Sequence, residues 1–200
     1  DTELNTLFNA IEASLRLLDH SSGNPAALAT HLKHHSLRTH TPSAQPVTIR
    51  LAESTEADTL LDAIMNLEAR MYEPARRDSR AMLAHAFEHP DGVVVVAEQH
   101  APSGRTLVGV CLGVPLEVVA HIDGPNHDPM LGQHNTLYIQ TLAVDPRYHG
   151  RGLGRELKLC ILHQSKALVT AAGVPRYLFQ TGRNRIGHTQ AVSQLNQSLG

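Results

Sequence analysis

The chain has 200 residues, which is enough for one ordinary domain with a small appendage. Hydrophobic residues make up 42% of it, so it can form a real core and general disorder is excluded. The formal net charge of −2 excludes a basic nucleic-acid binder that works through bulk charge, and there is no polybasic membrane anchor. No apolar run approaches the roughly 20 residues that a membrane-spanning helix needs.

Cysteine and histidine are informative in this composition. Cys111 and Cys160 lie in the apolar segments GVCLGV and LKLCIL, which indicates two reduced core thiols and a reducing, cytoplasmic location. His31, His34 and His35 could share one helix face and bind a metal. No Cys, Asp or Glu nearby completes a ligand set, so a solvated helix face and no metal site are expected.

The first 46 residues form an N-terminal helical appendage in this interpretation. Apolar residues at helical spacing predict an amphipathic helix over 2–19, and a second helix is expected over 25–37. Two prolines and polar residues over 38–46 are typical of a linker. The apolar stripe has to be buried on the main domain, on a missing neighbour or on a second copy, so a homodimer is one expected arrangement.

The main domain, 47–200, is expected to be α/β. Strands are predicted at 47–54, 92–99, 106–116, 136–146 and 175–181. Helices are predicted at about 56–72 and 78–89, from the glycine-rich segment to about 172, and at 187–198. A loop is expected at 121–134. Short turns make the middle strands antiparallel, whereas the strand before the long helix and the strand after it form a parallel crossover. The predicted fold is a mixed, mostly antiparallel sheet with helices on both faces.

A glycine-rich segment at 148–155 carries the chemical information. A strand ends, Gly150, Gly152 and Gly154 alternate with other residues, and a helix begins. Glycine permits positive φ, so successive N–H groups can point at one anion beside a helix N-terminus, and Arg151 can add a charge. We therefore expect a phosphate site. Arg155 replaces the third glycine of a dinucleotide fingerprint and no Lys-Ser or Lys-Thr follows, which leaves a nucleotide as a weaker alternative.

The hexapeptide His149-Gly150-Arg151-Gly152-Leu153-Gly154 resembles the signature Gln/Arg-x-x-Gly-x-Gly/Ala of the GNAT superfamily of acyl-CoA N-acyltransferases. The resemblance covers 47–200 and is strongest over 136–160. It implies that this hexapeptide cradles the pyrophosphate of acetyl-CoA or coenzyme A. It further implies that the backbone of Leu142, Ala143 and Val144 binds the pantetheine arm, that Asn184 contacts the same arm, and that the Val144 N–H holds the oxyanion.

Two positions depart from the family pattern. Gln140 stands where many relatives carry a glutamate base on the fourth strand, and it can only orient an amine or a water. Asn196 stands where a tyrosine of the last helix often protonates the leaving thiolate. Tyr138, two residues from Gln140 on the same strand face, is the expected substitute acid, with core packing as the alternative. The remaining candidate bases are Glu117, His121 and His134.

The acceptor site of the family lies near the first two helices. Candidates here are Glu68, Tyr72, Glu73, Arg76 and Arg77, whose mixed charges leave the acceptor class open. Relatives continue after the last helix into two further strands, so the domain is expected to lack its last strands.

The sequence thus predicts an N-acetyltransferase that transfers an acetyl group from acetyl-CoA to a primary amine, on a small molecule or a peptide, by direct attack in a ternary complex. No nucleic acid, membrane or metal is expected to take part. The alternative is a GNAT-like module that binds acyl-CoA as a sensor or scaffold without turnover.

Overall fold

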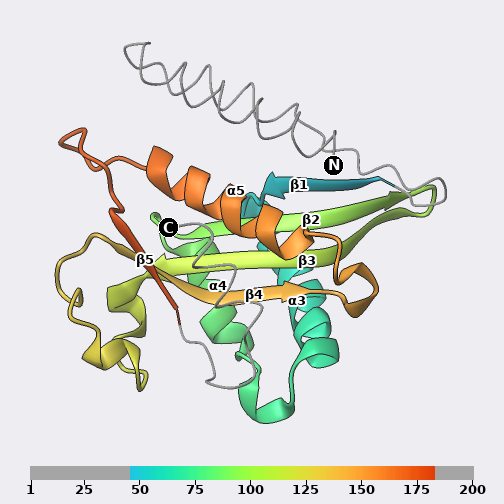
Figure 1. Ribbon diagram of the computed structural model, residues 1–200, viewed down its shortest axis with the longest axis horizontal. Coiled ribbons are helices and arrows are strands. Elements are labelled where there is room, and N and C mark those ends of the chain that lie inside the picture. Colours follow the sequence, from blue (N-terminus) through green and yellow to red (C-terminus); the bar gives the residue numbers. More distant parts are fainter. Residues whose placement is uncertain (1–45, 183–200) are drawn as a thin grey trace. The chain divides into compact units, whose positions relative to one another are not determined.

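A computed structural model describes residues 46–182, which form a five-stranded sheet (Figure 1). The strands are β1 (Val47–Leu51), β2 (Val93–Ala101), β3 (Gly104–Pro115), β4 (Thr136–Val144) and β5 (Phe179–Thr181). Their order across the sheet is their order in the chain. The first four are antiparallel neighbours, and β5 runs parallel to β4. The expected appendage up to residue 45, Asn184, Asn196 and the expected last helix lie outside the described residues.

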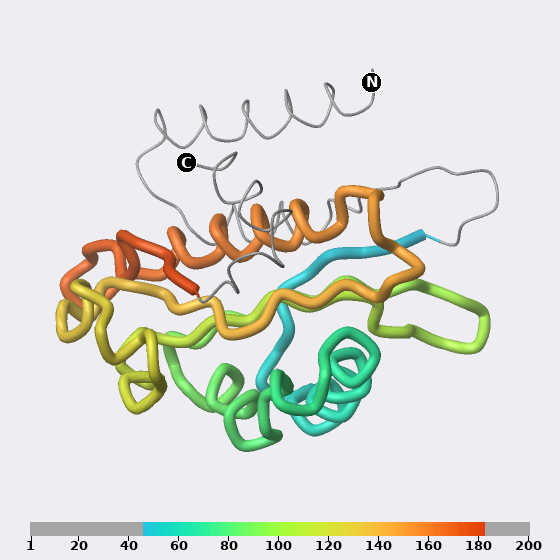
Figure 2. Tube along the Cα trace, turned by 60° about the horizontal axis from the view of Figure 1, so that its bottom comes forward, coloured from blue at the N-terminus to red at the C-terminus, as the bar shows by residue number. Residues whose placement is uncertain are grey.

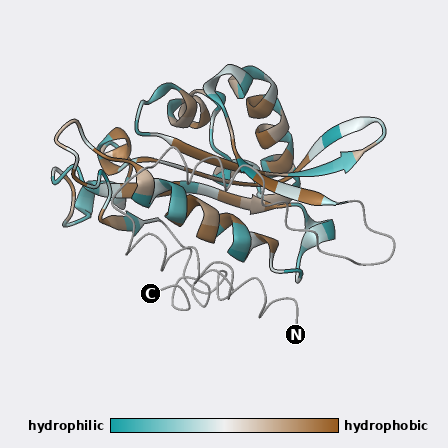
Figure 3. Ribbon diagram, turned by 90° about the horizontal axis from the view of Figure 1, so that it is seen from above, coloured by the Kyte–Doolittle hydropathy of each residue, from teal (hydrophilic) through white to brown (hydrophobic). Residues whose placement is uncertain are grey.

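Helices cover both faces of the sheet (Figure 2). The helices α3 (Ala57–Met71) and α4 (Arg80–Glu88) pack on one face, and α5 (Leu153–Ala167) packs on the other. Figure 3 shows hydrophobic residues on the central strands and on the helices that cover them. This confirms the predicted α/β class, with a mostly antiparallel sheet between helices.

The spacing of apolar residues explains which side each helix buries. In α3 the buried residues Leu60, Ile64 and Leu67 recur every three or four positions, so they form one stripe against the sheet. In α5 the fully buried Leu157 and Ile161 are four residues apart and contact the opposite face. The two cores therefore lie on opposite sides of the sheet, because successive side chains of a strand point to opposite faces.

Two predicted boundaries near the C-terminal end are wrong. The long helix ends at Ala167 and not at about 172, and the strand expected over 175–181 is reduced to β5. Leu168 is already extended, Val169 bridges to Pro175 in antiparallel fashion, and Gly173 turns the chain with φ of +76°. A small hairpin therefore replaces the last helical turn. The β-branched residues of Val169-Thr170 favour this extended conformation.

Further details refine the predicted elements. The loop expected over 121–134 contains a short 3-10 turn, η4 (Pro125–His127), and another, η3 (Leu116–Val119), precedes it.

Cys111 and Cys160 are free thiols, as predicted, and burial raises their pKa values to about 12 and about 11. Within residues 46–182, no helix is long and apolar enough to cross a membrane.

The turn between α4 and β2 depends on the absence of a side chain at Gly92. A Cβ atom there would lie 2.2 Å from the Ala86 carbonyl oxygen at the end of α4. We expect Gly92→Ala to lower the free energy of unfolding by about 1–3 kcal/mol, because backbone must move to relieve the overlap. Urea unfolding at pH 7 measures this. An unchanged midpoint and slope would show that the close approach is not needed.

Candidate active site

The site is organised by an irregularity in β4. The β3–β4 register pairs Gly113 with Ile139 and Leu112 with Thr141, so Gln140 is an extra residue without a partner on β3. Such a β-bulge bends the strand and redirects side chains. The consecutive side chains of Gln140 and Thr141 accordingly both reach the Asp78 Oδ2 atom, at 3.3 and 3.2 Å, although neighbours on a regular strand would face opposite ways.

Beyond this bulge, one edge of β4 is not paired with β5. The pairing with β5 covers Thr136–Tyr138 only. On the other edge, the Asp145 N–H donates to the Val108 carbonyl over 2.8 Å, and hydrogen-bonding direction alternates along an antiparallel strand. The backbone groups of Ala143 therefore face β3, whereas those of Leu142 and Val144 face away from β3. The N–H and carbonyl groups of Leu142 and Val144 thus lie on the edge of β4 that β5 does not pair with. We call the segment 142–144, on this side of β4, the open edge.

Two side chains form hydrogen bonds to the carbonyl oxygens of the open edge. The Tyr72 hydroxyl donates to the Leu142 carbonyl over 2.9 Å, and His149 Nε2 lies 2.7 Å from the Val144 carbonyl, which requires its proton on that nitrogen. Burial, followed by the charge of Glu68, raises the pKa of Tyr72, so its phenol stays protonated and can donate. The N–H groups of Leu142 and Val144 have no acceptor among the described residues.

The glycine-rich segment continues directly from the open edge. Gly150 and Gly152 have φ values of +73° and +78°, a region that favours glycine, and α5 begins at Leu153. The N–H groups of Arg155 and Glu156 bond to the Gly152 carbonyl. Within the described chain, the N–H groups of residues 150–154 have no acceptor, and they collect at the positive end of the α5 dipole. An anion is the group that this arrangement can hold.

Residues 61–185 match the model of the acetyltransferase (GNAT) family. The chain belongs to this family. None of the curated proteins matches the chain.

Solved structures show the same fold at low sequence identity. An aminoglycoside acetyltransferase from an uncultured soil metagenomic sample, in complex with sisomicin, is 15% identical with a TM-score of 0.52, over 77% of this chain and 88% of that one. AAC(6')-Iy, in complex with the bisubstrate analog CoA-S-monomethyl-acetylneamine, is 15% identical with a TM-score of 0.50, over 77% and 89%. These similarities identify the GNAT fold.

The structure places the two expected catalytic residues of this GNAT domain on the face of β4 that α3 and α4 cover. Tyr138 is buried in the core there, with 4% of its surface exposed, and Gln140 is half-buried beside Asp78. Asn184 and Asn196 are outside the described residues. Leu142 and Val144 pack toward α5 with their side chains, whereas Ala143 packs toward α3.

The candidate bases upstream lie in a different part of the GNAT domain. Glu117 Oε1 accepts the N–H groups of Gly132 and His134, at 3.2 and 2.9 Å, and the His134 ring is 3.6 Å away. This carboxylate therefore holds the loop before β4. His121 lies in the turn after η3 and is exposed.

Among the acceptor candidates, Tyr72 reaches the open edge and Glu68 reaches Thr141. Arg76 stacks on the Tyr72 ring at 5.2 Å, and Arg77 donates to the Tyr72 carbonyl over 2.8 Å. Both arginines thus support Tyr72.

Sequence reasoning missed Asp78 and Thr141. Asp78 precedes Ser79, whose hydroxyl caps α4 by accepting the Met82 N–H, so the acid resembled part of an ordinary helix start. Thr141 resembled a strand threonine. A signal was present only in their combination, because a buried threonine needs a hydrogen-bond partner from another element.

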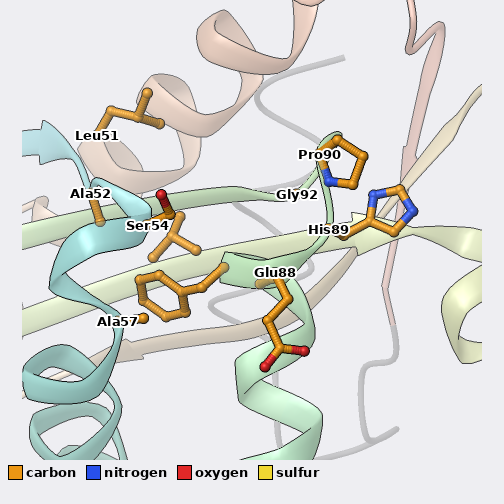
Figure 4. A pocket seen from close by; sticks show the side chains of 11 residues that line it. Leu51, Ala52, Ser54, Ala57, Glu88, His89, Pro90 and Gly92 are labelled. Atoms are coloured by element: carbon orange, nitrogen blue, oxygen red, sulfur yellow. The ribbon is translucent and has the colours of Figure 1, made fainter.

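A cavity also lies on another part of the domain, away from the open edge. This cavity of about 560 Å³ lies between the end of β1, the start of α3 and the end of α4, and its lining includes Leu51, Ser54, Phe87 and His89 (Figure 4). Since β2 and β3 separate β1 from β4, the cavity is not part of the open edge.

Within the described residues, no group of three or more His, Cys, Asp or Glu could hold a metal ion.

An ion pair fixes the exit of β4 before the glycine-rich segment. Asp145 is buried, accepts from Arg147 at 2.9 and 3.0 Å, and lies 3.3 Å from Arg70. The hydrogen bond from Arg147 lowers the pKa of Asp145 from 3.8 to about 2. The ionised carboxylate therefore stabilises the turn at neutral pH.

We expect Asp145→Asn to reduce the free energy of unfolding at pH 7 by about 2 kcal/mol, because the negative charge and one of the two oxygen atoms that accept from Arg147 are lost. Since the folded-state pKa is depressed, this stabilisation is complete above pH 3.8 and disappears as the pH falls toward 2. Urea midpoints at pH 7 and pH 3 measure it, with the exposed Asp58→Asn as control. An equal deficit at both pH values would contradict the electrostatic cause.

Proposed function

We propose that this GNAT protein transfers an acetyl group from acetyl-CoA to a primary amine in a ternary complex. The observation that carries the proposal is a pair of neighbouring sets of backbone N–H groups without an acceptor in the described chain, those of Leu142 and Val144 on the open edge and those of residues 150–154 at the start of α5. The amides of a pantetheine arm can add to the open edge as a further strand would, and a pyrophosphate suits the N-terminus of α5. Leu142 and Val144 would hold the arm, and His149 to Gly154 would hold the pyrophosphate.

The known structures support the same arrangement. AAC(6')-Iy was solved with the bisubstrate analog CoA-S-monomethyl-acetylneamine, which supports a fold that holds coenzyme A and an acceptor together. The sisomicin complex supports an amine acceptor that is a small molecule. A peptide amine remains within the proposal. Asn184 is proposed to contact the pantetheine arm.

The proposed reaction is direct. The amine nitrogen attacks the thioester carbon, the carbonyl oxygen becomes an oxyanion, and the carbon–sulfur bond breaks to release coenzyme A as a thiol. The Val144 N–H, on the open edge, is proposed to stabilise the oxyanion. Gln140 uses Nε2 to bond Asp78, so its carbonyl oxygen is the atom assigned to orient the amine. A substrate held in this geometry gains rate from positioning alone.

The alternative is an acyl-CoA sensor or scaffold without turnover. One observation favours it: Gln140, at the position of the usual base, is an amide and cannot accept a proton from the amine. Turnover separates the two. We would measure thiol release from acetyl-CoA with sisomicin, spermidine and a peptide with a free amino terminus, together with acetyl-CoA binding by calorimetry. Binding with acetylation of any of these amines supports the enzyme, whereas binding without acetylation of any of them supports the sensor.

Two tyrosines are candidates for the proton donor to the departing thiolate. Tyr138 shares a strand face with Gln140, and the Tyr72 hydroxyl lies at the open edge. We expect Tyr138→Phe to lower kcat by about 10²-fold at pH 7 and to leave acetyl-CoA affinity unchanged, as loss of a general acid does. Tyr72→Phe, measured in parallel, should alter KM for acetyl-CoA more than kcat. The reverse pattern would transfer the role to Tyr72.

We expect Gly152→Asp to abolish acetyl-CoA binding, with at least about a 100-fold rise in Kd. The new carboxylate would stand beside the pyrophosphate, and φ of +78° would no longer suit the residue. Gly173→Asp is a matched control, because Gly173 has φ of +76° and, like Gly152, no heavy atom within 4 Å of an added Cβ. Calorimetry measures the affinity. Equal affinities in two folded variants would contradict the assignment.

A further inference from the structure

A buried carboxylate lies behind the bulge of β4. Glu68 on α3 has only 1% of its surface exposed. One oxygen accepts the Thr141 hydroxyl at 2.6 Å, and the other accepts the Asp78 N–H at 3.0 Å. Burial raises the pKa of Glu68, and the bonds from Thr141 and Asp78 oppose that effect. An acid with this burial and both oxygens occupied cannot contact a substrate, but it can position its two partners.

The partner that faces outward is Asp78. It is half-buried in the segment between α3 and α4, where Glu68 holds its backbone. Its Oδ2 atom lies 3.3 Å from Gln140 Nε2 and 3.2 Å from the Thr141 hydroxyl oxygen. A carboxylate is therefore present at Gln140, although it belongs to another element and not to β4.

We propose that Asp78 is the catalytic base of the acetyl transfer, and that Glu68 and Thr141 are its positioning residues. This inference rests on the proposed function. The attacking group arrives as an ammonium ion, because an alkylamine has a pKa near ~10.4. Asp78 takes one proton from nitrogen, and the resulting amine attacks the thioester carbon. The tyrosine donor then protonates the leaving thiolate, and the second proton of the nitrogen restores that tyrosine. Asp78 then returns its proton to solvent, so one proton is released per turnover.

The chain of hydrogen bonds accommodates the transferred proton. The Thr141 hydroxyl has one proton, which it donates to Glu68 across the shorter distance. When Asp78 is protonated, it can donate to the Thr141 oxygen while Thr141 continues to donate to Glu68. The protonated form of Asp78 thus gains an acceptor. Among the described residues, the charge of Arg77 acts on Glu68, and Tyr72 lies close enough to feel the charges of Glu68, Asp78 and Arg76.

The experiment compares pH profiles of kcat/KM between pH 4 and 9.5, on the amine of the panel that the wild type acetylates. With Asp78→Asn, we expect a loss of about 10²–10⁴-fold at pH 7 and unchanged acetyl-CoA affinity. The remaining rate should rise tenfold per pH unit toward the amine pKa, because only the free amine then reacts, so the deficit shrinks at high pH. Asp78→Glu should restore part of the activity at pH 7.

Two further variants isolate the cause. Glu68→Gln removes a neighbouring negative charge, which favours ionised Asp78, so the acidic limb of the profile should move to lower pH. A merely structural role of Glu68 would not move that limb. Asp62→Asn removes the same charge from the exposed face of α3, where the side chain is 72% exposed, and should leave the profile unchanged.

Each outcome has a defined meaning. An Asp78→Asn profile with the wild-type shape and rate overturns the assignment of the base but leaves the proposed function intact. A deficit that is equal at every pH, in a folded variant, also overturns it, because it indicates positioning alone. If the wild type binds acetyl-CoA but acetylates none of the panel amines, the proposed function fails and this assignment fails with it.

Discussion

One extra residue in β4 determines most of what is distinctive about the site. Because Gln140 has no partner on β3, the strand bends, and two consecutive side chains reach the same carboxylate. β5 pairs with β4 only on the N-terminal side of the bulge. The backbone groups of Leu142 and Val144, which face away from β3, therefore lie beyond the stretch of β4 that pairs with β5.

The glycine-rich segment and the bulge are two parts of one arrangement. The buried ion pair of Asp145 with Arg147 fixes the strand exit, and the positive φ angles of Gly150 and Gly152 then turn the chain into α5. The His149 ring returns to the Val144 carbonyl, which ties the loop to the end of the open edge. The open edge and the N-terminus of α5 are therefore held together by a segment that is fixed at both ends.

The sequence predicts much of the fold because its signals are local. Apolar spacing in α3 and α5, and Pro or Gly at the turns, require only neighbouring residues, and the structure has those elements in the predicted order. Local signals fail where two distant segments compete for the chain. The helix ends early because Val169 pairs with Pro175, a contact that helical periodicity does not describe. The bulge likewise depends on β3, so no pattern within β4 indicates that Gln140 is the extra residue.

The same distinction between local and distant signals explains why Gln140 indicates a missing base in the sequence but does not indicate where another carboxylate lies. Read within its strand, it indicates that a base is missing from the usual position. Read in three dimensions, it donates a hydrogen bond to Asp78, which is 62 residues earlier in the chain. An amide beside a carboxylate is a stable pair, whereas a glutamate at position 140 would place a second negative charge beside Asp78 and raise the pKa of one of the two carboxyl groups. On our proposal, the glutamine at 140 is therefore the residue that a base at position 78 requires: it neutralises no charge, it orients the carboxylate, and it leaves a carbonyl oxygen for the amine.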